Sequence, residues 1–230
     1  MKSKDPKPYI RNVNEMIIQP IIQSDDFLRL NVLNYARSEF RNEAIRLKPE
    51  NTVPIDFTNI YNMSVAWDYV LKHLNTTINL GEVVQINSII SANNNEDITG
   101  GAFRYAMAYV LGQPAPNPAK IRDLLDTAIY KMNKDKNQIL TKAFDIHYDI
   151  VTIQPFSDFN KRTARIIMNW YLLQNNYTPI IFNNKNDNTE YVKSLRNRLN
   201  DDSKSYTAYM CDRAMRSQNA ILKMLSHRTR

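Results

Sequence analysis

Apolar residues recur at helical spacing along most of this 230-residue sequence. From about 136 to 153 they lie three and four residues apart between Leu140 and Val151, so a helix in this segment would bury one face. Pro155 interrupts the pattern, a short polar loop follows, and helical spacing resumes from about 160 to 175. The same spacing predicts helices at about 62–75, 81–93, 119–132, 187–199 and 203–226. The sequence therefore predicts an all-α protein.

A further helix is expected nearer the N-terminus. Ser24 and the two aspartates that follow it form a favourable helix start, because a hydroxyl can cap the first turn and acidic side chains favour the positive end of the helix dipole. We expect this helix to run to about Leu47 and to end before Pro49, since proline cannot continue a helix.

One segment departs from helical spacing. Aromatic and aliphatic residues run from Gly101 to Gly112, and prolines follow at Pro114, Pro116 and Pro118. Glycine and proline at the ends of such a run are typical of a short hairpin or an extended flap. The predicted fold class is thus all-α with a small β element.

The composition is that of one soluble globular domain, with 43% apolar and 23% charged residues. The single cysteine, Cys211, excludes an intramolecular disulfide, and the three histidines are too scattered to indicate a zinc site by their spacing. No segment approaches the roughly 18–20 apolar residues that a membrane span needs, and no apolar signal-peptide core follows the polar N-terminus. We expect a cytoplasmic protein that does not contact a membrane.

The formal net charge is +7, with a pI near 9.4. A basic excess can serve nucleic acid, acidic partners or bound phosphates. Acidic residues interrupt most of the basic clusters, so a solvated basic surface is the simplest interpretation and nucleic acid is not an expected partner.

The segment 154–165 holds the residues best suited to chemistry. It should form a loop followed by the start of a helix, and the backbone N–H groups of a helix N-terminus bind anions. Asn160 supplies an amide, Lys161 a flexible cation and Arg162 a planar fork that fits phosphate oxygens. Asp158 could hold Mg²⁺ beside those phosphates. The alternative is that Asn160 only caps the helix while Arg162 and Arg165 sit in surface ion pairs.

The same segment resembles the motif of the Fic/Doc family, His-Pro-Phe-x-(Asp/Glu)-Gly-Asn-Gly-Arg-x-x-Arg. The matching residues, in unbroken register, are Pro155, Phe156, Asp158, Asn160, Arg162 and Arg165. His147 lies where family members often carry a histidine, and the segment 102–111 is similar to the family's target-docking flap, with Arg104 following Phe103. The resemblance extends from about Asn59 to Phe182.

This resemblance implies a Fic-like helical bundle with a small β-hairpin flap. It also implies three segments: an N-terminal helical extension at 1–58, a core at 59–182, and C-terminal helices at 183–230 packed on that core. By the same resemblance the cofactors are ATP and Mg²⁺, with Asp158 as the metal ligand and the phosphates held by Asn160, Lys161, Arg162 and Arg165. A target protein would dock at the flap 102–111.

The sequence departs from the family pattern at three positions. Gln154 replaces the motif histidine, which in relatives takes the proton from the target hydroxyl, and an amide has no usable basicity near neutral pH. His147 lies about 10 Å away along a helix axis, which is too far to replace that histidine, so we expect it to be a packed core residue. Phe159 stands where relatives have glycine or alanine, and a positive φ would be strained for it.

The third departure is Lys161, which replaces the second glycine as in the Doc branch, whose members transfer phosphate rather than AMP. Many AMP-transferring relatives also carry a Ser/Thr-x-x-x-Glu inhibitory helix, and no Ser or Thr in this sequence has Glu four residues later. The lack of this motif fits a chain with no activity to restrain, and it fits equally one restrained by a regulatory partner.

Three interpretations stay open on the sequence. The first is an impaired family member in which Asp158 and Arg162 are kept but Gln154 cannot act as the base. The second is an active protein adenylyltransferase or Doc-like phosphotransferase with altered chemistry. The third is a non-catalytic module that binds protein or nucleic acid.

Overall fold

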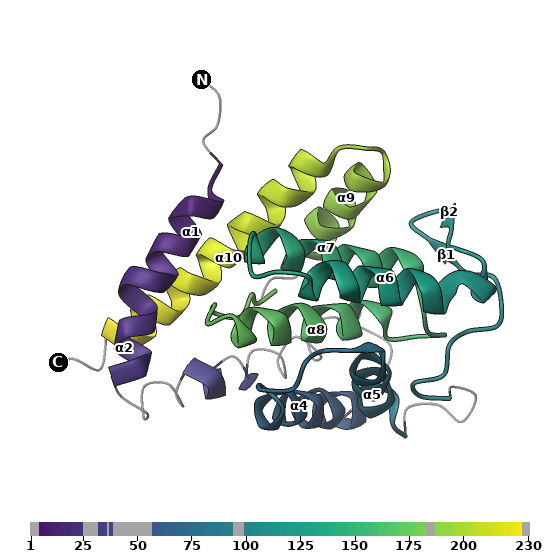
Figure 1. The fold of residues 1–230 in the computed structure, drawn as a ribbon, viewed down its shortest axis with the longest axis horizontal. Helices are drawn as coiled ribbons and strands as arrows, with labels where there is room; N and C mark the ends of the chain where they lie inside the picture. The colour runs from purple at the N-terminus through teal and green to yellow at the C-terminus, as the bar shows by residue number, and fades with distance from the viewer. Residues whose placement is uncertain are drawn as a thin grey trace. The chain divides into compact units, whose positions relative to one another are not determined.

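The computed structural model describes residues 5–24, 32–35, 37–38, 57–93, 99–182 and 187–226. The chain divides into two compact units, one formed by Met1–Glu43 with Asn176–Arg230 and the other by Ala44–Asn175. The predicted boundaries after residues 58 and 182 stay a prediction. The described part is mainly helical with a single two-stranded hairpin, which confirms the predicted fold class (Figure 1).

The unit Ala44–Asn175 is a bundle of helices around α8. Its helices are α4 (Phe57–Lys72), α5 (Leu80–Ser91), α6 (Ile121–Asn133), α7 (Ile139–Ile153) and α8 (Asn160–Gln174), with the short 3-10 turn η2 (Pro118–Lys120) before α6. Helix α8 packs against α7, α5 and α4, and α7 packs against α6 (Figure 1). Because three helices surround it, most of α8 is buried, including Trp170.

The helix ends in this unit follow from local sequence. Asn79 caps α5 by accepting a hydrogen bond from the Glu82 N–H, and Asn117 does the same for the Ala119 N–H at η2. Helix α7 buries its predicted apolar face from Leu140 to Ile153. The bounds of α5, α6, α7 and α8 agree with the predicted ranges to within a few residues.

The predicted flap contains the hairpin. Strands β1 (Tyr109–Val110) and β2 (Gln113–Pro114) pair antiparallel through a two-residue turn. Both turn residues have positive φ, 55° at Leu111 and 88° at Gly112, which is the combination that gives a hairpin turn its matching twist. Before the hairpin, Phe103 forms an isolated bridge with Phe156 of the motif loop.

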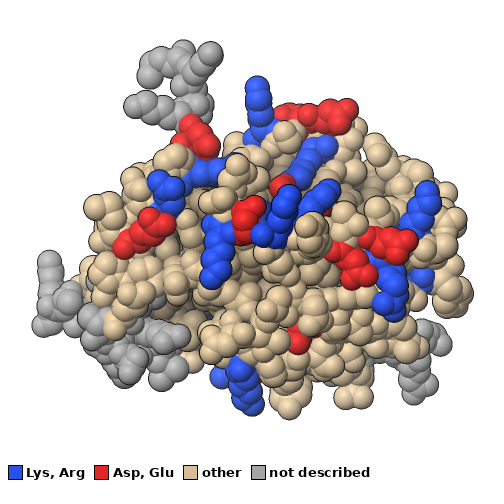
Figure 2. Space-filling view, viewed as in Figure 1, with Lys and Arg blue, Asp and Glu red and all other residues tan. Residues whose placement is uncertain are grey.

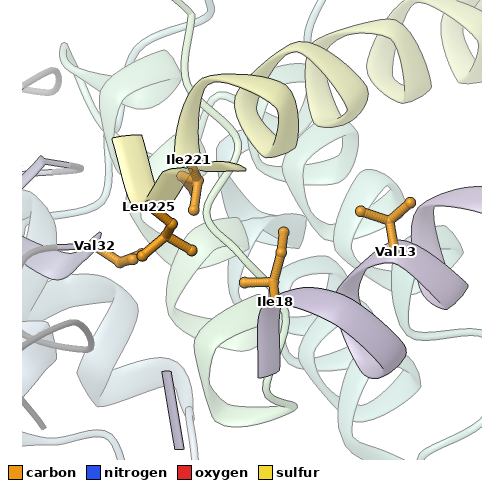
Figure 3. Close-up of a cluster of buried hydrophobic side chains, with 5 residues drawn as sticks. All are labelled: Val13, Ile18, Val32, Ile221 and Leu225. Atoms are coloured by element: carbon orange, nitrogen blue, oxygen red, sulfur yellow. The ribbon is translucent and has the colours of Figure 1, made fainter. Parts of the chain in front are cut away.

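The other unit holds α1 (Lys7–Val13), the π-helical turn η1 (Asn14–Ile18), α2 (Gln19–Ser24), α9 (Asp187–Leu199) and α10 (Ser203–Ser226). Helix α10 packs against α9 and α1. One part of its core is an apolar cluster of Val13, Ile18, Val32, Ile221 and Leu225 (Figure 3). The bounds of α9 and α10 coincide with the predicted ranges.

The expected helix start at Ser24 is wrong, because Ser24 is the last residue of α2. Residues 32–35 and 37–38 are helical, as predicted for that segment. The rest of the predicted helix, including Leu47 and the stop at Pro49, lies outside the described residues. Helix α2 begins at Gln19, five residues before the predicted start.

Candidate functional site

The motif loop joins α7 to α8 through two residues in the left-handed region. Gln154 ends α7 with φ 49° and ψ 59°, and Phe159 precedes α8 with φ 62° and ψ 13°. For a residue with a Cβ, this conformation costs about 1–2 kcal/mol. The loop therefore holds two strained positions, and neither of them is a glycine. The positive φ at Phe159 is the strained conformation that its place in the motif predicts.

The loop is held by its own amide side chains. Asn160 accepts a hydrogen bond from the Phe156 N–H (2.9 Å), and its Nδ2 donates to the Phe156 carbonyl (2.8 Å) and to Gln154 Oε1 (2.9 Å). The Gln154 amide nitrogen in turn donates to the Val151 carbonyl (3.0 Å). Asn160 is buried, and these hydrogen bonds of its side chain maintain the shape of the loop.

The N-terminus of α8 presents donors to the loop. The Thr163 N–H donates a hydrogen bond to the Phe159 carbonyl (2.9 Å), at the start of α8. The N–H groups of Asn160 and Lys161 precede it, and helix geometry directs them into the loop. The Lys161 side chain is exposed at the same turn. These groups form a positively polarised end of the helix that suits an anion.

The predicted arginines differ in their surroundings. The Nη1 of Arg162 donates to Asn59 Oδ1 on α4, and its guanidinium carbon lies 5.2 Å from the centroid of the Phe159 ring. Arg165 is buried within α8, one turn further on. Lys161 and Arg162 therefore lie next to the loop, whereas Arg165 is buried further along α8.

Asp158 is exposed in the loop, and its Oδ1 accepts a hydrogen bond from the Phe159 N–H (2.6 Å). No group of three or more histidine, cysteine or acidic side chains that could hold a metal ion is found in the described ranges. Asp158 is the one residue of the motif loop 154–165 with a carboxylate side chain.

His147 is fully buried in α7, as expected for a core residue of the apolar face. It therefore belongs to the interior of the helix bundle.

Arg104 is a residue whose role the sequence did not reveal. Its side chain is only 5% exposed and donates to four backbone carbonyls. These belong to Gln154 (2.6 Å), Pro116 (2.7 Å), Ala106 (2.8 Å) and Ile153 (3.1 Å). The backbone N–H of Arg104 also donates to the Pro155 carbonyl (3.0 Å). Burial lowers the pKa of the Arg104 guanidinium from its ordinary value. Arg104 thereby ties both ends of the flap to the start of the motif loop.

Asn87 of α5 is the second such residue. It is 1% exposed, donates to the Asp158 carbonyl and to Thr163 Oγ1 (both 3.1 Å), and accepts from the Gly101 N–H (3.0 Å). Gly101 has φ 77°, and a Cβ there would lie 3.0 Å from the Val84 carbonyl oxygen. The signal available in the sequence was an amide side chain among the apolar residues Val83, Ile86 and Ile90 of α5.

The flap also presents large side chains to solvent. Tyr105 is 93% exposed, and Met107 and Tyr109 are exposed at the alternating positions that follow. On the face shown in Figure 2, basic and acidic side chains lie beside one another, with no extended basic patch. Within the described ranges, no helix has the length and apolar content that crossing a membrane requires.

Comparisons with known proteins agree with the motif. Residues 77–172 match the model of the Fic/DOC family. The "Protein adenylyltransferase Fic" of Aedes aegypti is 26% identical over 184 residues, which cover 75% of this chain and 37% of the relative. The protein of the same name from Drosophila persimilis is 26% identical over 173 residues, 71% of this chain and 34% of the relative. The chain thus spans about a third of the length of these curated relatives.

Solved structures show the same fold. A Fic domain containing signaling protein from Bacteroides thetaiotaomicron superposes with a TM-score of 0.71 at 16% identity, covering 86% of this chain and 90% of that one. Fic-1 from C. elegans gives a TM-score of 0.58 at 18% identity, covering 89% and 73%. At these identities the likeness concerns the fold alone. The family model thus matches residues 77–172, and the fold of the chain is similar to that of solved Fic proteins.

Proposed function

We propose that the motif loop 154–165 binds the polyphosphate of a nucleotide, with ATP and Mg²⁺ as the expected ligands, and that transfer to a protein hydroxyl is impaired. The observation that carries this proposal is the state of Gln154. Its amide oxygen accepts from Asn160 and its amide nitrogen donates to Val151, so the side chain supports the loop at the position of the family's base.

The binding half of the proposal rests on the N-terminus of α8. The N–H groups of Asn160 and Lys161, the ammonium of Lys161 and the guanidinium of Arg162 are donors and cations gathered within one turn. Phosphate oxygens are suited to all three kinds of group. Asp158, exposed beside them, would hold the cation through Oδ2, since Oδ1 accepts the hydrogen bond from the Phe159 N–H.

The impaired half follows from proton transfer. The attacking hydroxyl must lose its proton, and an amide cannot take it up near neutral pH. Losing a general base of this kind costs about 10²–10⁴ in rate. The loop would then keep positioning and charge neutralisation, and binding would outlast efficient transfer.

The alternative is an active transferase with altered chemistry, and the exposed Asp158 carboxylate favours it as the one candidate base in the loop. Phosphoryl transfer depends strongly on positioning and charge neutralisation, so a weak base costs it less than it costs other reactions. Lys161 would then suit phosphate transfer, as in the Doc branch. A non-catalytic module that binds nucleic acid is less favoured, since acidic residues interrupt most of the basic clusters in the sequence.

In either case we propose that a target protein docks at the flap 102–111, in the cytoplasm. Arg104 holds the base of this flap against the motif loop, and Tyr105, Met107 and Tyr109 extend from it into solvent. A strand edge with exposed aromatic side chains offers both backbone pairing and apolar contacts to an extended segment.

Calorimetric titration with ATP and Mg²⁺ tests the binding half. We expect binding by the native chain and a loss of at least tenfold in affinity for Arg162→Ala, since a charge-assisted contact to phosphate is removed. Equal affinity of the two proteins would place the phosphates elsewhere.

Replacing Gln154 by histidine tests the impaired half. With ATP labelled on its α- or γ-phosphate, Gln154→His should raise labelling of the protein or of added protein by about 10²–10⁴. The chain offers a matched control in Gln138, a glutamine at the opposite end of α7 whose backbone is also in the left-handed region (φ 54°, ψ 41°). Gln138→His should leave labelling unchanged. Strong labelling by the native chain would instead support the active alternative.

A further inference from the structure

Arg162 is held from two sides by side chains of this chain. The Phe159 ring, from the residue before α8, lies 5.2 Å from the guanidinium carbon. Asn59, in the first turn of α4, accepts a hydrogen bond from Nη1 with its Oδ1. Asn59 is 103 residues before Arg162 in the chain, so this contact exists only because α4 packs beside α8.

The two contacts use different parts of the guanidinium. Its N–H donors lie in the plane of the group and are the ones that a phosphate engages, often in pairs. The hydrogen bond to Asn59 occupies a donor in that plane. The aromatic ring attracts the cation through its π-electrons, and such a contact restricts how the guanidinium can turn. A phosphate that approaches the Nη1 edge of Arg162 competes with Asn59, and one that turns the guanidinium disturbs its contact with the Phe159 ring.

The choice of residues makes this hold reversible. Asn59 is neutral, and an amide oxygen is a weaker partner for a guanidinium than a phosphate oxygen that carries charge. Phe159 contributes only a cation–π contact. Its backbone has a φ of 62°, which residues with a large side chain rarely adopt. Contacts of this strength are too weak to exclude a polyphosphate.

We propose that Phe159 and Asn59 form a latch on Arg162 that weakens polyphosphate binding at the motif loop. This inference rests on the function proposed above, and it gives the departure from glycine at position 159 a role in setting the affinity. Ligand binding opens the latch, and the part of the binding free energy used to open it is lost from the affinity.

The latch is tested by titrating ATP and Mg²⁺ into three variants beside the native chain. Phe159→Leu keeps a large side chain and the same backbone demand but removes the π-system, and it should raise the affinity about 2–5-fold. Asn59→Ala frees the Arg162 donor and should raise it roughly 3–10-fold. Tyr61→Ala, at a position that is 69% exposed on the same helix, is the control and should leave the affinity unchanged.

A second comparison separates the latch from simple obstruction. If the bulk of Phe159 blocked the pocket, Phe159→Gly would raise the affinity while Phe159→Leu would not, and that result would overturn the latch. The gain in affinity of the double variant Phe159→Leu with Asn59→Ala should differ from the product of the single gains, because both residues act on one guanidinium. Should one single variant fail to fold, the other carries the test.

The outcomes also distinguish the latch from the proposed function. ATP binding by the native chain, lost in Arg162→Ala but unchanged or weakened in Phe159→Leu and Asn59→Ala, would refute the latch and leave the proposed function standing. Absence of binding in the native chain and in all variants would refute the proposed function and the latch together. Binding that is measurable only after the latch residues are replaced would support both.

Discussion

Replacing Arg104 by alanine should destabilise the junction between the flap and the motif loop. Its guanidinium donates to four carbonyls at 2.6–3.1 Å, from Gln154, Pro116, Ala106 and Ile153. The Ile153 carbonyl is buried at this contact, so truncation leaves it without its donor, at a cost of about 1–3 kcal/mol. The other three carbonyls are partly buried and can be rehydrated, so each should lose about 1 kcal/mol or less.

An opposing term reduces this loss. The buried guanidinium is itself desolvated, which lowers its pKa, and removing it recovers part of that cost. We therefore expect Arg104→Ala to lower the free energy of unfolding by about 3 kcal/mol, which for a chain of this size corresponds to a fall in Tm of roughly 6–12 °C. Urea unfolding measures the free energy, and amide hydrogen exchange in the hairpin 109–114 should increase because the flap loses its attachment.

Two variants control this prediction. Arg122→Ala removes another arginine near the flap, one that is exposed and lies 5.9 Å from the Phe103 ring centroid, and it should cost less than about 1 kcal/mol. Arg104→Lys keeps the charge but has only three donors on a point charge, so it should recover part of the loss. A cost for Arg104→Ala no larger than that for Arg122→Ala would refute the reasoning.

Two further predictions concern the same unit. Asn87→Ala should cost about 2–3 kcal/mol in urea unfolding, since it leaves the Gly101 N–H and the Thr163 hydroxyl without a buried partner; a cost as small as that of the exposed Asn137→Ala would contradict this. Burial, and then the charge of Asp135, raises the pKa of Tyr171 to about 12, whereas an unfolded tyrosine titrates near 10. Above pH 10 the unfolded chain releases this proton and the folded chain keeps it, so the free energy of unfolding should fall by about 1 kcal/mol per pH unit, and Tyr171→Phe should flatten that slope in urea titrations from pH 9 to 11; identical slopes would contradict it.

Local patterns in the sequence predict much of the helical structure. Helices α9 and α10 lie in the predicted ranges because apolar residues recur there at helical spacing. Ser24 shows where such local information fails. Its acidic neighbours suggest a helix start, yet it belongs to α2, which begins at Gln19, because one capping residue is a weak signal against the helix that precedes it.

The sequence by itself determined the helical fold class and the motif loop between α7 and α8, because spacing, proline punctuation and motif register are local properties. Only the tertiary structure decided which groups the motif residues meet. Arg104 bonds to carbonyls, which every residue carries, so no residue type marks its partners in advance. The contact between Arg162 and Asn59 joins positions 103 residues apart, and it depends on how α4 packs beside α8. Long-range hydrogen bonds of this kind follow from packing, and the local pattern of the chain does not record them.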